Sequence, residues 1–71
     1  MATQYWKLEK SGELSAAEVA AAVGGGGHIV LRTDVAKGKT TIYFAGGSED
    51  EQAKADRAHA KKIKLADVIK F

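Results

Sequence analysis

Four basic side chains in the C-terminal third of the chain are spaced so that they could bind phosphate groups. They are Lys54, Arg57, Lys61 and Lys64, at intervals of three, four and three residues. Residues three and four apart are neighbours on a helix, so a helical segment would place all four on one face. Such a row can neutralise phosphates of a nucleic acid. The alternative is an ordinary solvated helix face, and Asp50 offsets part of the charge.

A second candidate surface combines aromatic and basic side chains on one face of a predicted sheet. Alternation along three predicted strands puts on this face Tyr5, Lys7, Val30, Arg32, Thr41 and Tyr43. Aromatic residues and arginine are enriched where proteins meet partners. We therefore predict that a partner is bound by Tyr5, Lys7, Arg32, Tyr43 and the four basic residues above. Trp6 is expected in the core or on the sheet surface.

The segment 37–44 resembles the signature of the RNA-recognition motif, K/R-G-F/Y-G/A-F-V-x-F/Y. The resemblance holds at Lys37, Gly38, Ile42 and Phe44. It fails at the positions of the base-stacking aromatic residues, where this chain has lysine and threonine. The resemblance implies RNA binding by the sheet face, while the alternative interpretation is an ordinary amphipathic strand.

Residues for catalysis or metal binding do not form a recognisable constellation. The two histidines, His28 and His59, are too few for a closed metal site, even with Asp56 three residues before His59. No serine or threonine has a histidine placed to activate it. We therefore predict no enzymatic activity, no catalytic residue, no metal ligand and no cofactor.

Two serines indicate where helices begin. Residues 15–18 (Ser-Ala-Ala-Glu) and 48–51 (Ser-Glu-Asp-Glu) both fit the S-x-x-E capping box, and Leu14 with Val19 forms a hydrophobic staple. Helices are expected over 16–23 and 51–62. Gly46 and Gly47 precede the second box in the order that suits anion binding, but three acidic residues follow and would repel an anion.

Strands are predicted over 4–10, 28–35 and 39–45, because β-branched and aromatic residues alternate there. A short loop ending at Gly38 would join the last two as a hairpin. After Lys62 the helix either runs nearly to Phe71 or gives way to a fourth strand near Lys64. The fold is therefore α+β, with an antiparallel sheet of three or four strands and two helices on one face (βαββα or βαββαβ, the latter ferredoxin-like). The predicted core is Trp6, Leu8, Ile29, Leu31, Ile42 and Phe44.

Composition limits the remaining choices. We expect the 71 residues to form one domain, 1–71. A chain this short buries only about 60% of its unfolded surface, so association with a partner would help to stabilise it. The chain has no cysteine, no signal-peptide pattern and no membrane-spanning run, which favours an intracellular, non-membrane protein. The net charge of +2 is compatible with nucleic-acid binding but does not require it.

We expect a non-enzymatic adaptor, inhibitor or assembly protein that contacts another protein, or itself, through a sheet face or edge. The alternative is a nucleic-acid-binding module.

Overall fold

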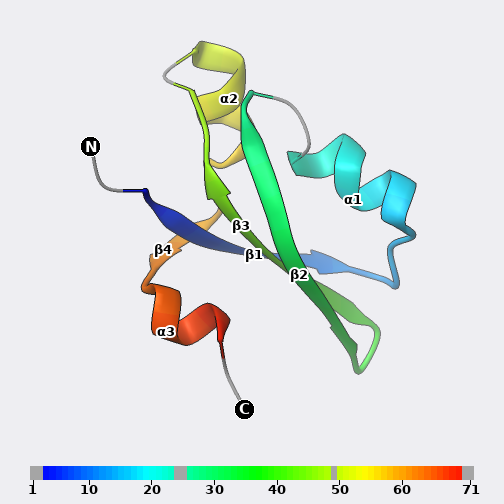
Figure 1. The fold of residues 1–71 in the computed structure, drawn as a ribbon. Coiled ribbons are helices and arrows are strands. Elements are labelled where there is room, and N and C mark those ends of the chain that lie inside the picture. Colours follow the sequence, from blue (N-terminus) through cyan, green and yellow to red (C-terminus); the bar gives the residue numbers. More distant parts are fainter. Residues whose placement is uncertain (1–2, 24–25, 49, 70–71) are drawn as a thin grey trace.

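The computed structural model describes residues 3–23, 26–48 and 50–69, which form a small α+β structure (Figure 1). The strands are β1 (Tyr5–Ser11), β2 (His28–Ala36), β3 (Lys39–Gly46) and β4 (Lys61–Ile63). The helices are α1 (Ala16–Val23), α2 (Glu51–Asp56) and α3 (Leu65–Val68). The described residues are mostly sheet with a few short helices, which agrees with the predicted α+β class, whereas three short helices stand in place of the two that were predicted.

The four strands form one antiparallel sheet in the order β2-β3-β1-β4. Through β4 the element order is βαββαβ, and α3 follows as a further short helix. Strands β3 and β1 lie in the centre, whereas β2 and β4 are the two edges. The long edge is β2, with nine residues, and the short edge is β4, with three.

A two-residue turn sets the register between β2 and β3. Ala36 pairs with Lys39, and the two loop residues both have positive φ, 52° at Lys37 and 71° at Gly38. This is the type I′ conformation, whose twist matches that of the flanking strands. Glycine adopts it without steric cost, so Gly38 explains why the chain reverses here.

The core lies on one face of the sheet, between the central strands and α1. Its buried members are Leu8, Val19, Val23, Ile42 and Phe44, with Trp6, Leu14, Ala22 and Ala60 packed against them. The predicted core positions of β1 and β3 are therefore confirmed. The capping box of α1 also forms: Ser15 Oγ accepts a hydrogen bond from Glu18 N at 3.3 Å, and Glu18 Oε1 accepts one from Ser15 N at 3.2 Å.

The predicted facing of β2 holds from Arg32 onward but is wrong before it, because a β-bulge interrupts the pairing between Val30 and Arg32. Cross-strand partners share a face. Val30 pairs with Phe44 and so lies on the core face, although the sequence pattern put it on the opposite one. Ile29 and Leu31, which were predicted in the core, are 65% and 43% exposed. The extra residue at the bulge shifts the alternation, and the edge position leaves one side of β2 uncovered.

The predicted helix 51–62 is also wrong in its second half. Helix α2 ends at Asp56, with Arg57 as its C-cap, and Lys61–Ile63 pairs with β1 as β4. The fourth strand is real, but it begins three residues before the predicted position near Lys64. Pairing with β1 satisfies backbone groups along an edge that would otherwise lack partners, which outweighs continued helix in this segment.

The second capping box does not form as predicted. The N-cap of α2 is Asp50, which makes no side-chain cap hydrogen bond, and Glu49 lies outside the described residues. Among the described residues, Ser48 Oγ accepts one long hydrogen bond, 3.4 Å, from Asp50 N. The Ser48 backbone is better anchored, because its N–H donates to Gly26 O at 2.6 Å. Ser48 is therefore a turn residue and not a helix cap.

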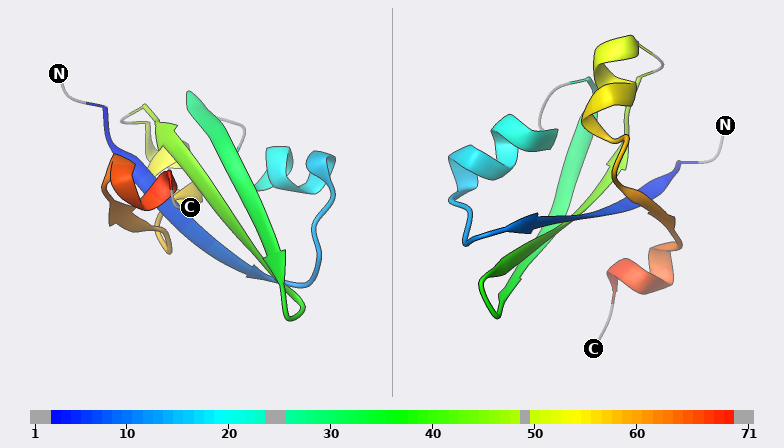
Figure 2. Two further views of the ribbon diagram at one scale, coloured as in Figure 1. Left: turned by 60° about the horizontal axis from the view of Figure 1, so that its bottom comes forward. Right: turned by 180° about the vertical axis from the view of Figure 1, so that it is seen from behind.

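Helix α3 lies on the sheet face opposite the core. In both views of Figure 2, α1 and α3 lie on opposite sides of the sheet. Val68 of α3 is buried, and its carbonyl oxygen accepts a hydrogen bond from Arg32, which shares the non-core face with Tyr43. Part of the face that the sequence pattern left open is therefore covered by the C-terminal segment.

Candidate binding surface

The sheet face opposite the core brings together several of the predicted binding residues. Lys7 pairs with Tyr43 across β1 and β3, Arg32 pairs with Tyr43 across β2 and β3, and Tyr5 belongs to the same face two residues before Lys7. All four side chains are half-buried. Their shared face agrees with the predicted pattern, but their burial leaves less accessible surface than a fully open face would have.

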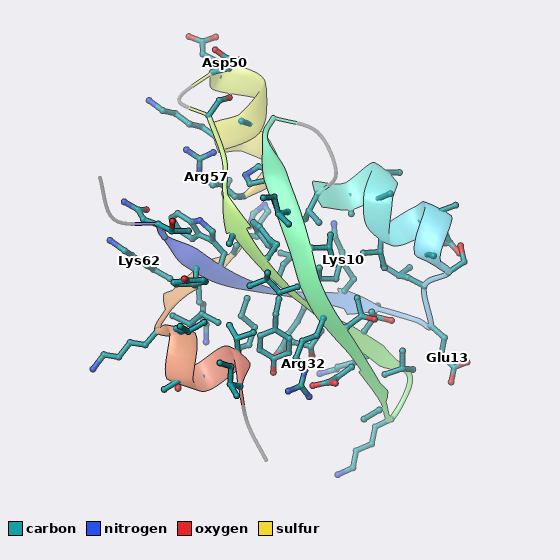
Figure 3. All side chains as sticks on the ribbon, in the orientation of Figure 1. Lys10, Glu13, Arg32, Asp50, Arg57 and Lys62 are labelled. Carbon is teal, nitrogen blue, oxygen red and sulfur yellow. The ribbon has the colours of Figure 1, made fainter. Side chains whose placement is uncertain are left out.

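Arg32 is held by three contacts within the chain. Its Nη2 donates to both carboxylate oxygens of Asp34, at 2.7 and 2.8 Å, and its Nη1 donates to Val68 O at 2.9 Å. The guanidinium carbon also lies 5.2 Å from the Tyr43 ring centroid. The hydrogen bond with Asp34 raises the pKa of Arg32 above its usual value. Figure 3 shows Arg32 beside α3. This side chain therefore fastens α3 to the sheet, a role that its sequence position did not predict.

The four basic residues proposed to share one helix face are not on one helix. Lys54 belongs to α2, Arg57 is its C-cap, Lys61 lies in β4 and Lys64 is the N-cap of α3. Only Lys61 joins the sheet face described above, because it pairs with Lys7. The prediction that these four residues share one helix face is therefore wrong, because it depended on a continuous helix.

Arg57 instead takes part in a cluster at the end of the sheet where β3 finishes. Its Nη1 donates to Ser48 O at 2.8 Å, and its guanidinium carbon lies 5.7 Å from the Trp6 ring centroid. Its Nη1 also lies 3.4 Å from Nε2 of the buried His28, whose ring meets Phe44 edge to face. These contacts hold the turn at Ser48 against the core.

A small basic hollow lies beside β4. Its lining is Lys7, Glu9, His59 and Lys61, and its volume is about 110 Å³. Lys7 and Lys61 stand directly opposite each other across β1 and β4. Like charges in that position are destabilising, and an anion between them would relieve the repulsion. Glu9 belongs to the same lining and carries the opposite charge.

The most exposed apolar surface of the described residues is on the edge strand β2. We define the β2 edge surface by Ile29, Val30, Leu31 and Val35, all of which are exposed. One side of it continues into a groove between α1 and β2. This α1–β2 groove has a volume of about 360 Å³ and is lined by Leu14, Ala16, Val19, Ala20, Val30 and Thr33.

The sequence contained one signal for this surface that the strand pattern alone did not resolve. The run Ile29-Val30-Leu31 is apolar at three consecutive positions, which alternation between two faces cannot bury on one side only. Such a run fits either a strand covered on both faces or a strand with an exposed apolar edge. The strand order places β2 at the end of the sheet, so the second alternative, an exposed apolar edge strand, is the one that forms.

Comparison with protein-family models, with curated proteins and with solved structures gives no significant match. Within residues 3–23, 26–48 and 50–69, no helix is long and apolar enough to cross a membrane. In the same described segments, no three or more histidine, cysteine, aspartate or glutamate side chains come together as a group able to hold a metal ion.

Proposed function

We propose that this protein is a small non-enzymatic binding protein that acts through protein–protein contact at its β2 edge. The observation that carries the proposal is the β2 edge surface: a nine-residue edge strand with exposed Ile29, Val30, Leu31 and Val35. A long apolar edge presents unpaired backbone N–H and C=O groups, which are a template for another strand. Strand addition to such an edge is a recurring mode of protein recognition.

The neighbouring groove supports the same function. An added strand gains affinity from main-chain hydrogen bonds and specificity from pockets that receive alternate side chains. The α1–β2 groove lies on the core side of β2, where Val30 and Thr33 form one wall and Leu14, Ala16 and Val19 are among its other lining residues. Every second side chain of the added strand would enter this apolar groove, while the others would lie on the opposite face near Arg32.

Two matched variants test the proposal. Leu31→Lys places a charge on the β2 edge surface, and Leu65→Lys places the same charge on α3, where the leucine has a similar exposure, 46% against 43%. A lysine on an edge strand opposes strand addition. In affinity capture from an extract of the source cells, a partner recovered by the parent protein and by Leu65→Lys should be lost with Leu31→Lys. Equal recovery with both variants would exclude the β2 edge as the contact.

A second candidate function is nucleic-acid binding at the basic hollow, favoured by the opposed pair Lys7 and Lys61. Counterion release would make the logarithm of the affinity fall with the logarithm of the salt concentration by about 0.7 per single-strand phosphate contact or about 0.9 per duplex contact. Changing both lysines to glutamine should then remove one or two phosphate contacts and reduce that slope by the corresponding amount. The protein-contact proposal instead expects weak binding of generic DNA or RNA at physiological salt, unaltered by the double substitution.

A further inference from the structure

We infer that the occupant of the β2 edge is a second copy of this chain. The two β2 strands pair antiparallel about a twofold axis that passes through Thr33, so that two four-stranded sheets become one continuous sheet. This inference rests on the proposed function and deepens it, because it names the partner and the register. Three properties of β2 carry it: the direction of its unpaired backbone groups, the order of its charges and the position of the α1–β2 groove.

The hairpin turn fixes which backbone groups of β2 point outward. In the two-residue turn, the C=O of Ala36 and the N–H of Lys39 face each other, so this pair is hydrogen-bonded. Hydrogen-bonded and non-hydrogen-bonded pairs alternate along an antiparallel ladder. Asp34 is therefore bonded to β3, whereas the N–H and C=O groups of Thr33 and Val35 point to the free edge. Thr33 lies near the middle of the strand and can exchange two hydrogen bonds with its own copy.

When two β2 strands pair, opposite charges face each other only in some registers. With the axis at Thr33, Arg32 lies opposite Asp34 of the second copy, and the reverse pair forms at the same time. An axis at Asp34 would oppose two carboxylates, and an axis at Arg32 would oppose two guanidinium groups. Like charges directly opposite each other are destabilising, whereas opposite charges stabilise the pair. Arg32 and Asp34 already form an ion pair within one chain, so the dimer would contain a network of two such pairs.

The apolar residues of β2 meet in the same register. Three residues of β2 follow one another along its core side: Val30, Thr33 and Val35. Val30 takes the place next to Thr33 because the bulge adds one residue between them. Antiparallel pairing about Thr33 therefore brings Val35 of the second copy close to Val30. Val30 is a wall of the α1–β2 groove, so this valine enters a site that is already apolar. Both valines are exposed in one copy of the chain, and burying them favours association.

The remaining edge explains why this association stops at two copies. Strand β4 has only three residues, and two of them are Lys61 and Lys62. Short, lysine-rich edges resist further strand addition. Once the two β2 edges are paired, the combined sheet ends in two β4 strands, so a closed dimer is expected in place of a fibre.

Cysteine scanning tests the register, because the chain has no cysteine of its own. In the inferred dimer, the two Thr33 Cα atoms form a hydrogen-bonded pair about 5.5 Å apart. This separation suits a disulfide, which needs Cα atoms within about 7 Å. The matched control is Val35→Cys, also exposed and on the same face, whose two copies would lie about 14 Å apart because each residue adds about 3.4 Å along the strand. Under mild oxidation, Thr33→Cys should form covalent dimer at least about tenfold faster than Val35→Cys, because the paired state raises the effective thiol concentration.

A mass measurement in solution completes the test. Sedimentation equilibrium of the parent protein over a concentration series should give twice the 7.5 kDa mass of the chain at the higher concentrations. Leu31→Lys should shift the equilibrium to monomer, and Leu65→Lys should leave it unchanged. Equal cross-linking of the two cysteine variants would overturn the Thr33 register. A monomer at every concentration would overturn the dimer, and the protein-contact function would still stand if a different protein were lost specifically with Leu31→Lys. If the protein is monomeric at every concentration and no protein is lost specifically with Leu31→Lys, both the dimer and the protein-contact function are excluded.

Discussion

Arg32 Nη1 donates a 2.9 Å hydrogen bond to the carbonyl oxygen of Val68, and this contact joins the middle of β2 to the C-terminal helix α3. The two residues are 36 positions apart in the chain. Asp34 holds the guanidinium from the other side through both of its carboxylate oxygens. The side chain that the sequence pattern assigned to partner binding therefore organises the outer face of the sheet.

Replacing Arg32 by lysine should loosen α3 without unfolding the sheet. Lysine keeps the charge but lacks the planar fork that contacts Asp34 and the Val68 carbonyl together. Amide hydrogen exchange should become faster at Ile69, whose N–H is bonded to Leu65 O, while β1 and β3 stay protected. Asp34→Asn, which weakens the orientation of Arg32, should give a smaller effect in the same direction. Unchanged exchange at Ile69 in both variants would show that Val68 is held by packing alone.

Thr40→Val should lower the free energy of unfolding by about 1–3 kcal/mol, the cost of leaving a buried polar group unsatisfied. The fully buried Thr40 hydroxyl accepts a hydrogen bond from Leu14 N at 3.0 Å and donates one to Gly12 O at 2.8 Å. It thereby fixes the turn between β1 and α1. Thr41→Val, at the half-buried neighbouring position on the other face, is the matched control. Urea denaturation of both variants measures the difference. An equal loss of unfolding free energy in the two variants would show that the hydrogen bonds of the Thr40 hydroxyl contribute no additional stability.

Gly47→Ala should be more destabilising than Gly12→Ala. Both glycines have positive φ, 106° and 88°, so alanine is strained at either position by about 1–2 kcal/mol. At Gly47 a Cβ atom would additionally stand 2.5 Å from His28 Nε2 and 2.9 Å from Arg57 Nη1, whereas at Gly12 no heavy atom lies within 4 Å. Thermal unfolding of the two variants measures this difference. Equal melting temperatures would mean that the His28–Arg57 cluster yields at little cost.

Ser15→Ala and Ser48→Ala should differ in their effects on stability. Ser15 caps α1 with a reciprocal hydrogen bond to Glu18, so its loss should cost about 0.5–2 kcal/mol. Within the described part of the chain, the Ser48 hydroxyl accepts one contact, 3.4 Å from Asp50 N, while the backbone contacts of Ser48 survive the substitution. Chemical denaturation should therefore show the larger loss for Ser15→Ala. The reverse order would restore the helix-capping role predicted for Ser48.

The candidate surface could be predicted only in part. Alternation along β1 and β3 correctly grouped Tyr5, Lys7 and Tyr43, because those strands pair without interruption. The helical row of basic residues failed because the spacing of three and four has meaning only if the helix is continuous, and the chain leaves α2 after Asp56. The residues of the β2 edge surface were not predicted, because a short apolar run has the same sequence pattern in a buried strand and in an exposed edge strand.

The sequence by itself determined the features that depend on neighbours within a few positions: the α1 cap at Ser15, the β2–β3 turn at Gly38, and the core face of β1 and β3. Local backbone preference and side-chain period are enough to specify these. Only the tertiary structure decided that β2 is an edge with a bulge, that Lys61–Ile63 becomes a strand, and that Arg32 binds the C-terminal helix. Each of these depends on partners distant in the sequence, and their pairing energy overrides the weaker local preference of the segment.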